Sequence, residues 1–170
     1  MEEEGRTNSE KLRSGTVHKR ELMLSVFWDS KGIVLLDFLE KKRTMNSDYY
    51  CNLLECARTR RRKPRNSPLW LLHDNAPIHT SQTTVDTLNK AGFEIIAHPP
   101  YSQDMAPSDF YLFQHLKKHL RGRKFEDADE LRNSVEEWFE MQPPEFFSCA
   151  LEQLLKRWKS VVDARGSYIE

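Results

Sequence analysis

The sequence predicts an α/β domain built on a mixed β-sheet, and two patterns carry that prediction. Apolar runs at 21–28 and 33–39 are joined by the turn Asp-Ser-Lys-Gly, which indicates an antiparallel hairpin. An apolar strand, a helix and a second strand then follow within about thirty residues, at 68–98, which is typical of a βαβ unit with parallel strands. The 170 residues are the length of one domain. An antiparallel hairpin and a parallel strand pair within one domain predict a mixed sheet.

Local signals define the elements of the first half. Residues 1–16 have almost no apolar content and are expected to form a disordered leader before a domain at 17–170. After the hairpin, Ser47 is expected to cap a helix at 48–58, which a basic, proline-containing loop then ends. The run at 68–73 is apolar throughout, as in strands that are buried on both faces.

The second half is expected to be mainly helical. Gly92 is suited to the C-terminal cap of the βαβ helix, and Gly122 to the end of a later, longer helix. The expected segments are a helix at 81–92, a strand at 93–98, a proline-rich loop at 98–109, and helices at 108–121, 127–141 and 144–159.

The charge of the chain is balanced overall but unevenly distributed. The 26 basic and 26 acidic residues cancel, yet basic residues concentrate at 58–65 and 115–124. Such patches on a neutral chain are typical of nucleic-acid binding, although a solvated loop and a helix end would carry the same charges. The residues predicted to contact nucleic acid are Arg60, Arg61, Arg62, Lys63, Lys117, Lys118, Arg121, Arg123 and Lys124.

Other classes of protein are disfavoured. No apolar run approaches the roughly 18 residues of a membrane span, and the polar, acidic N-terminus resembles neither a signal peptide nor a presequence. The scattered Cys51, Cys56 and Cys149 predict reduced thiols in an intracellular protein. Neither a membrane partner nor a small-molecule cofactor is expected.

Polar side chains follow the strand at 68–73 in the stretch HDNAPIHTS. Ligand sites in open α/β sheets lie beyond the carboxyl ends of parallel strands, where Asp74 and His98 stand. Asp109 begins a helix and is expected to face the core, because it lies four, seven and eleven residues before the members of an apolar stripe and so on the same side of that helix. The stripe consists of Phe113, Leu116 and Leu120.

Two carboxylates directed at one place repel each other unless a cation or a proton lies between them. Oxygen ligands without thiolates suit Mg²⁺ or Mn²⁺. Asp74 and Asp109 are therefore the predicted catalytic and metal-binding residues, and Asn75, His79 and His98 are possible supports for the site.

Simpler interpretations stay open. Asp74 could form an Asx turn, Asp109 could favour the positive end of its helix, and the histidines could be structural. A third possibility is an unrelated metal hydrolase built on His73, Asp74, His79 and His98.

Four stretches resemble the catalytic domain of mariner-type transposases. They are LMLSVFWDSKG, HDNA followed by HTS, HPPYSQDMAPSDFYLF, and RWKSVVDARGSYIE, and the resemblance covers 17–170. The 34 residues between Asp74 and Asp109 match the spacing of the family's "DNA" and "PSD" aspartates, a highly specific pairing. Such a domain also occurs fused to a SET-domain histone methyltransferase.

The resemblance implies an RNase H-like fold, in which a mixed sheet is flanked by helices. It also implies DNA cleavage and joining with two Mg²⁺ or Mn²⁺ ions held by three aspartates. Asp74 resembles the second of these aspartates and Asp109 the third. DNA, a possible homodimer and a nuclear location are the implied partners and setting.

The chain also departs from the family. The family's first aspartate lies on a strand before the hairpin, whereas 1–16 contain no aspartate and no strand pattern. Asp29 is no substitute, because it matches a hairpin-turn position of the family. The region that recognises transposon ends is expected to be missing. Pro77-Ile78 stands where the family has Arg-Pro, and Gln103 stands where it has a proline. We expect a truncated or decayed copy that lacks its central strand and has little transposition activity. A domesticated DNA-binding or protein-interaction module is the alternative.

Overall fold

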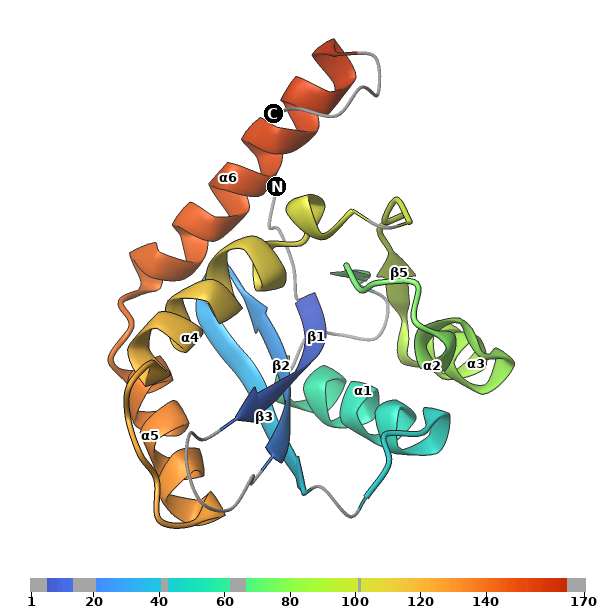
Figure 1. Cartoon of the computed structure of the whole chain (residues 1–170). Helices are drawn as coiled ribbons and strands as arrows, with labels where there is room; N and C mark the ends of the chain where they lie inside the picture. The colour runs from blue at the N-terminus through green and yellow to red at the C-terminus, as the bar shows by residue number, and fades with distance from the viewer. Residues whose placement is uncertain (1–5, 14–20, 41–42, 62–66, 101, 165–170) are drawn as a thin grey trace.

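The computed structural model describes residues 6–13, 21–40, 43–61, 67–100 and 102–164. Its strands form an antiparallel sheet in the order β1-β2-β3 and a separate parallel pair, β4-β5. The predicted α/β class is therefore confirmed (Figure 1), whereas the described antiparallel and parallel strands lie in two sheets and not in the single mixed sheet that was predicted. The strands are β1 (Arg6–Arg13), β2 (Glu21–Asp29), β3 (Gly32–Glu40), β4 (Leu69–Leu71) and β5 (Phe93–Ile95). The helices are α1 (Ser47–Arg61), α2 (Pro77–Thr80), α3 (Gln82–Ala91), α4 (Phe113–Leu120), α5 (Ala128–Glu140) and α6 (Pro144–Asp163), with short turns η1 (Gln103–Met105) and η2 (Ser108–Leu112).

Strand β1 corrects the prediction of a disordered leader and of a sheet that lacks its first strand. It pairs with β2 along its whole length, from Arg6 opposite Trp28 to Arg13 opposite Glu21. Because the backbone groups on this side of β2 are thus paired, the sheet does not carry the cost of a missing neighbour. In the hydrogen-bonded order β1 stands at one edge of its sheet, not at the centre.

The two faces of strand β2 support two apolar cores. Leu22, Leu24, Val26 and Trp28 face a core completed by η2, α4, α5 and the start of α6. The intervening Phe27 faces a second core with α1, β3, β4 and α3. Figure 1 shows the same layering, with α1 on one side of the sheet and α4 and α5 on the other. This alternation is the expected period-two pattern of a strand buried on both faces.

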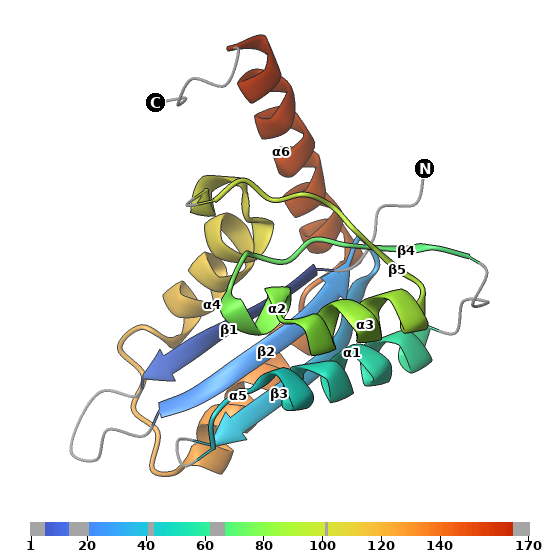
Figure 2. The same ribbon diagram turned by 90° about the vertical axis from the view of Figure 1, so that its right-hand side faces the viewer.

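The βαβ unit forms as predicted, with shorter strands. Leu69 pairs with Phe93 and Leu71 with Ile95 in parallel register. Ser81 caps α3 by accepting a hydrogen bond from the backbone N–H of Thr84 at 3.3 Å. Gly92 ends the helix at φ 71°, a left-handed conformation that favours glycine. Figures 1 and 2 show α3 of this unit lying beside α1.

Other boundaries shift for identifiable reasons. Helix α1 continues to Arg61, so part of the basic cluster belongs to its last turn and not to a loop. A short helix, α2, follows Asp74 where no helix was predicted, with Pro77 in its first turn. Proline is favoured there because it has no N–H to leave unpaired.

The predicted helix at 108–121 begins with a π-helical turn, η2, before α4 continues the α-helix. Phe113 and Leu116 are buried and Leu120 is partly buried in the predicted stripe. Asp109 lies within the π turn, so the simple helical offset that placed it on that stripe does not apply.

Helix α6 leaves the body of the domain: its C-terminal half extends beyond the other elements (Figures 1 and 2). Its first turns are held by Phe147, Ala150, Leu151 and Leu154. No helix in the described part of the chain is sufficiently long and apolar to cross a membrane.

Candidate metal and nucleic-acid site

Asp74 follows β4 and is fixed by two hydrogen bonds to the same oxygen. Its Oδ1 accepts from the Nδ1–H of His79 at 2.6 Å and from the backbone N–H of Ala76 at 3.0 Å. The hydrogen bond from His79 is the largest cause that lowers the pKa of Asp74 to about 2, with the Ala76 bond adding to it and burial opposing it. The Ala76 bond is the Asx turn of the simpler interpretation. It coexists with an ionised carboxylate whose side chain is 44% exposed.

A buried aromatic cluster supports this carboxylate from behind. The imidazole of His79 is stacked on that of His73 at 4.8 Å between centroids, and the ring of Tyr50 lies 4.4 Å from His79. The Tyr50 hydroxyl lies 3.0 Å from His73 Nδ1. Both histidines are buried. His73 and His79 therefore pack in the protein interior, and His79 also orients Asp74.

Asn75 and His98 connect the ends of the two parallel strands. The side-chain amide of Asn75 donates to the backbone carbonyl of His98 at 2.9 Å. This contact brings two of the candidate supporting residues together, with His98 contributing its backbone.

Asp109 lies half-buried in η2, and core packing brings this turn to the end of β4. Leu72, two residues before Asp74, packs in one apolar cluster with Phe110, the residue after Asp109. Leu154 of α6 completes that cluster. The two predicted ligands therefore come from neighbouring elements.

The hypothesis of an unrelated metal hydrolase is not supported. Among the described residues, no group of three or more histidines, cysteines and carboxylates is placed to hold a metal ion. His79 Nδ1 is directed at Asp74, and His73 Nδ1 at Tyr50. Asp74 and Asp109 form no such group among the described residues either, and a site with only two carboxylates would suit Mg²⁺ or Mn²⁺, which keeps several waters and needs few protein ligands.

The two basic clusters differ in their surroundings. In α1, Arg58 is buried and donates to the carbonyl of Ser67 at 3.4 Å, and Arg60 donates to that of Val34 at 3.5 Å. Arg61 forms an ion pair with Asp29, whose side chain is only 1% exposed. The contacts of Arg58 and Arg61 involve buried groups, which favours the structural interpretation for these two. Arg60 is exposed and keeps the nucleic-acid interpretation open. Arg62 and Lys63 lie outside the described residues.

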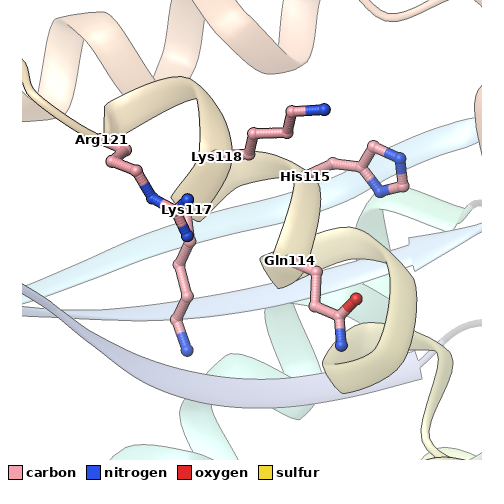
Figure 3. Close-up of a pocket in the computed structure, with 5 residues that line it drawn as sticks. All are labelled: Gln114, His115, Lys117, Lys118 and Arg121. Carbon is pink, nitrogen blue, oxygen red and sulfur yellow. The ribbon is translucent and has the colours of Figure 1, made fainter.

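The second cluster is exposed. Lys117, Lys118, Arg121, Arg123 and Lys124 all have exposed side chains on or just after α4. Together with Gln114 and His115, the first three line a surface pocket of about 340 Å³. Figure 3 shows Lys117 and Gln114 extending to one side of the helix, with Lys118 and His115 on the other. This pocket is suited to a phosphate group, because several flexible cations surround it.

Some contacts of the site had no signal in the sequence. Tyr50 belongs to the apolar stripe of α1, so its contact with two histidines could not be read from helical spacing. The hydrogen bond from Trp28 to Ser108, beside Asp109, joins residues 80 positions apart. Asp29 is buried against Arg61 at the hairpin turn, and the carbonyl of Asp104 accepts from Arg157 at 2.7 Å.

Comparison with known proteins identifies the family. Residues 4–69 match the family model for a transposase, described as a partial DDE domain. The chain is 32% identical over 160 residues to the human histone-lysine N-methyltransferase SETMAR, covering 91% of this chain and 23% of that protein. It is also 32% identical over 157 residues to the Mariner Mos1 transposase of Drosophila mauritiana, covering 89% and 46%.

The solved Mos1 transposase catalytic domain with raltegravir and manganese superposes with a TM-score of 0.87 at 30% identity, over 98% of this chain and 84% of that one. This chain belongs to the mariner-type transposase catalytic domains. A Mos1 paired-end complex with a left transposon end matches with a TM-score of 0.88 at 26% identity, over 98% and 56%.

The mariner relationship confirms the RNase H-like fold. The family match begins at residue 4, so β1 lies inside the matched stretch. β1 contains no aspartate; its one acidic residue is Glu10. The chain spans less than half the length of the two curated relatives.

Proposed function

We propose that this transposase-derived domain binds DNA and, weakly, one divalent cation, and that it does not cut or join DNA. The proposal rests on a difference in acidic residues between strands β4 and β1 of the domain. β4 is followed by Asp74, ionised and oriented by His79, whereas β1 contains no aspartate. By their resemblance to the family, Asp74 and Asp109 would supply two of its three acidic positions.

Asp74 and Asp109 would hold the cation, and manganese in the Mos1 structure supports this choice of metal. A bound Mg²⁺ or Mn²⁺ supplies Lewis-acid stabilisation at a phosphodiester. The protein's own contribution is orientation: His79 and Ala76 fix one oxygen of Asp74, so that the carboxylate keeps a constant direction. With two carboxylates the spacing of a metal pair is not fixed, and a misplacement of about 1 Å costs roughly a hundredfold in rate.

DNA binding is supported by the exposed cations of the α4 pocket and by the transposon DNA in the Mos1 complexes. The same pocket favours the second candidate, a non-catalytic DNA-binding module. A nuclear location and a homodimer are part of the proposal, as the setting and assembly in which such a domain meets DNA.

Paramagnetic broadening by Mn²⁺ tests the metal site. We expect weak binding by the parent chain and at least a tenfold loss of affinity in Asp74→Ala and in Asp109→Ala. Asp86→Ala is the matched control, because Asp86 is exposed on α3 and its carboxylate bonds Gln82. Equal affinity in all three variants would remove the metal site from the proposal. Binding without nicking of a mariner-end duplex would support the full proposal.

A further inference from the structure

Two irregularities of the backbone meet at one buried hydrogen bond. The register of β2 against β3 shifts between Phe27 and Trp28, as in a β-bulge. The π-helical turn η2 begins at Ser108. The indole Nε1–H of Trp28 donates to Ser108 Oγ at 3.0 Å, and both side chains are buried, at 1% and 0% exposure. Bulges and π turns are enriched at functional sites, where they redirect side chains.

The surroundings leave this bond few alternatives. The indole N–H can only donate, and a buried donor without a partner costs about 1–3 kcal/mol. The Trp28 ring is itself held by Phe147, whose ring centroid lies 6.0 Å away. Ser108 is thereby tied to β2 through a tryptophan that is buried in the core.

The bond acts on the residue next to Ser108. Asp109 follows it directly in the π turn, and the Asp109 backbone N–H donates to the carbonyl of Ala106 at 2.7 Å. If η2 relaxed to an ordinary α-helical turn, the angular position of Asp109 relative to Phe113 and Leu116 would change, because the number of residues per turn would change. The carboxylate would then leave the direction it has in the structure.

We propose that Trp28 and Ser108 are positioning residues, which hold Asp109 in place for the cation by fixing the π turn against β2. This inference rests on the proposed metal site. Neither residue is proposed as a metal ligand. The hydrogen bond between the Trp28 indole and the Ser108 hydroxyl instead fixes the backbone conformation of the turn that carries Asp109.

The test is a double-mutant cycle in Mn²⁺ affinity with Ser108→Ala, Trp28→Phe and the double variant. We expect each single variant to bind Mn²⁺ at least fivefold more weakly, and the double variant to lose no more than the larger single effect. Shared loss is expected because both changes remove the same bond. Unfolding in urea is measured alongside, so that affinities are compared only among folded chains.

Tyr49→Phe is the matched control, since it removes a partly buried hydrogen bond to Asp37 at 2.7 Å, away from Asp109. Its Mn²⁺ affinity should equal that of the parent. The positioning role would be overturned by any of three results. These are a Ser108→Ala variant that binds Mn²⁺ as tightly as the parent, a double variant whose loss of affinity is the product of the two single losses, and a Tyr49→Phe variant that loses as much affinity as Ser108→Ala. If Trp28→Phe does not fold, Ser108→Ala against Tyr49→Phe decides. A parent chain that binds no Mn²⁺ would instead refute the proposed function, and the positioning role with it.

Discussion

Replacing Arg61 by alanine should destabilise the domain without weakening its binding to DNA. Arg61 is the ion-pair partner of Asp29, whose side chain is 1% exposed while that of Arg61 is 25% exposed. The change leaves a carboxylate in the interior with its remaining hydrogen bond, from the backbone N–H of Lys31 to Oδ1 at 2.8 Å. A charge at this depth cannot recover its hydration by moving its short side chain.

The size of the effect follows from the burial. Breaking a fully buried ion pair costs about 3–5 kcal/mol. Arg61 is partly hydrated and Asp29 keeps one donor, so we expect about 2–3 kcal/mol. For a domain of this length, each kcal/mol corresponds to roughly 2–4 °C in Tm, hence a fall of about 4–12 °C. Asp29→Asn in the Arg61→Ala background should recover part of the loss, because it removes the unpaired charge.

Urea unfolding and a fluorescence-anisotropy titration with duplex DNA would measure the two properties on the same samples. Arg123→Ala is the matched control: it is an exposed arginine just after α4 and should change stability by no more than about 0.5 kcal/mol. Unfolding of Arg61→Ala at the same urea concentration as the parent chain would show that this ion pair does not stabilise the domain. An equal loss of DNA affinity in Arg61→Ala and Arg123→Ala would show that Arg61 contacts DNA as well.

Three further outcomes are expected. Replacing Lys118 and Arg121 by alanine should weaken DNA binding uniformly across sequences and reduce the salt dependence by about 0.9 per lost phosphate contact; an unchanged slope between 50 and 200 mM salt would contradict this. No nicking of a mariner-end duplex should occur with Mg²⁺ or Mn²⁺, and robust nicking that Asp74→Ala abolishes would show that another carboxylate completes the site. The pKa of Asp74 is lowered from 3.8 to about 2, so its stabilising effect is present above about pH 4 and lost as the pH falls through 2. The stability advantage of the parent over Asp74→Asn should therefore shrink over that window by about 1 kcal/mol, a value discounted for the exposure of this side chain; a constant difference would count against the hydrogen bond from His79 as the cause.

The sequence predicted those elements whose own residues determine them. The β2–β3 hairpin and the β4–α3–β5 unit each have local apolar runs, turn residues and caps, and both were found. β1 could not be predicted, because Arg6–Arg13 has no apolar alternation. Its strand conformation comes from pairing with β2, an interaction between segments that local propensity does not describe.

The same distinction applies to the candidate site. Asp74 and His79 lie five residues apart, so the local sequence grouped them at one candidate site, although their hydrogen bond was not predicted. The charge pattern of the sequence could not predict that Arg61 forms an ion pair with Asp29, because this pair joins α1 to the end of β2. The π turn depends on a tryptophan 80 residues from its serine, and no local pattern signals it.

The long separation of Trp28 from Ser108 also has a consequence for the order of folding. The β1-β2-β3 meander and the β4-α3-β5 unit close short loops, whereas this bond closes one of 80 residues. The additional loop-closure entropy relative to the 24-residue separation of Leu69 and Phe93 is about 1 kcal/mol. We expect the two local units to form first and the docking of η2 and α4 on the sheet to come after the rate-limiting step. Loss of this bond should then accelerate unfolding and leave the refolding rate almost unchanged, as expected for contacts that are absent from the transition state.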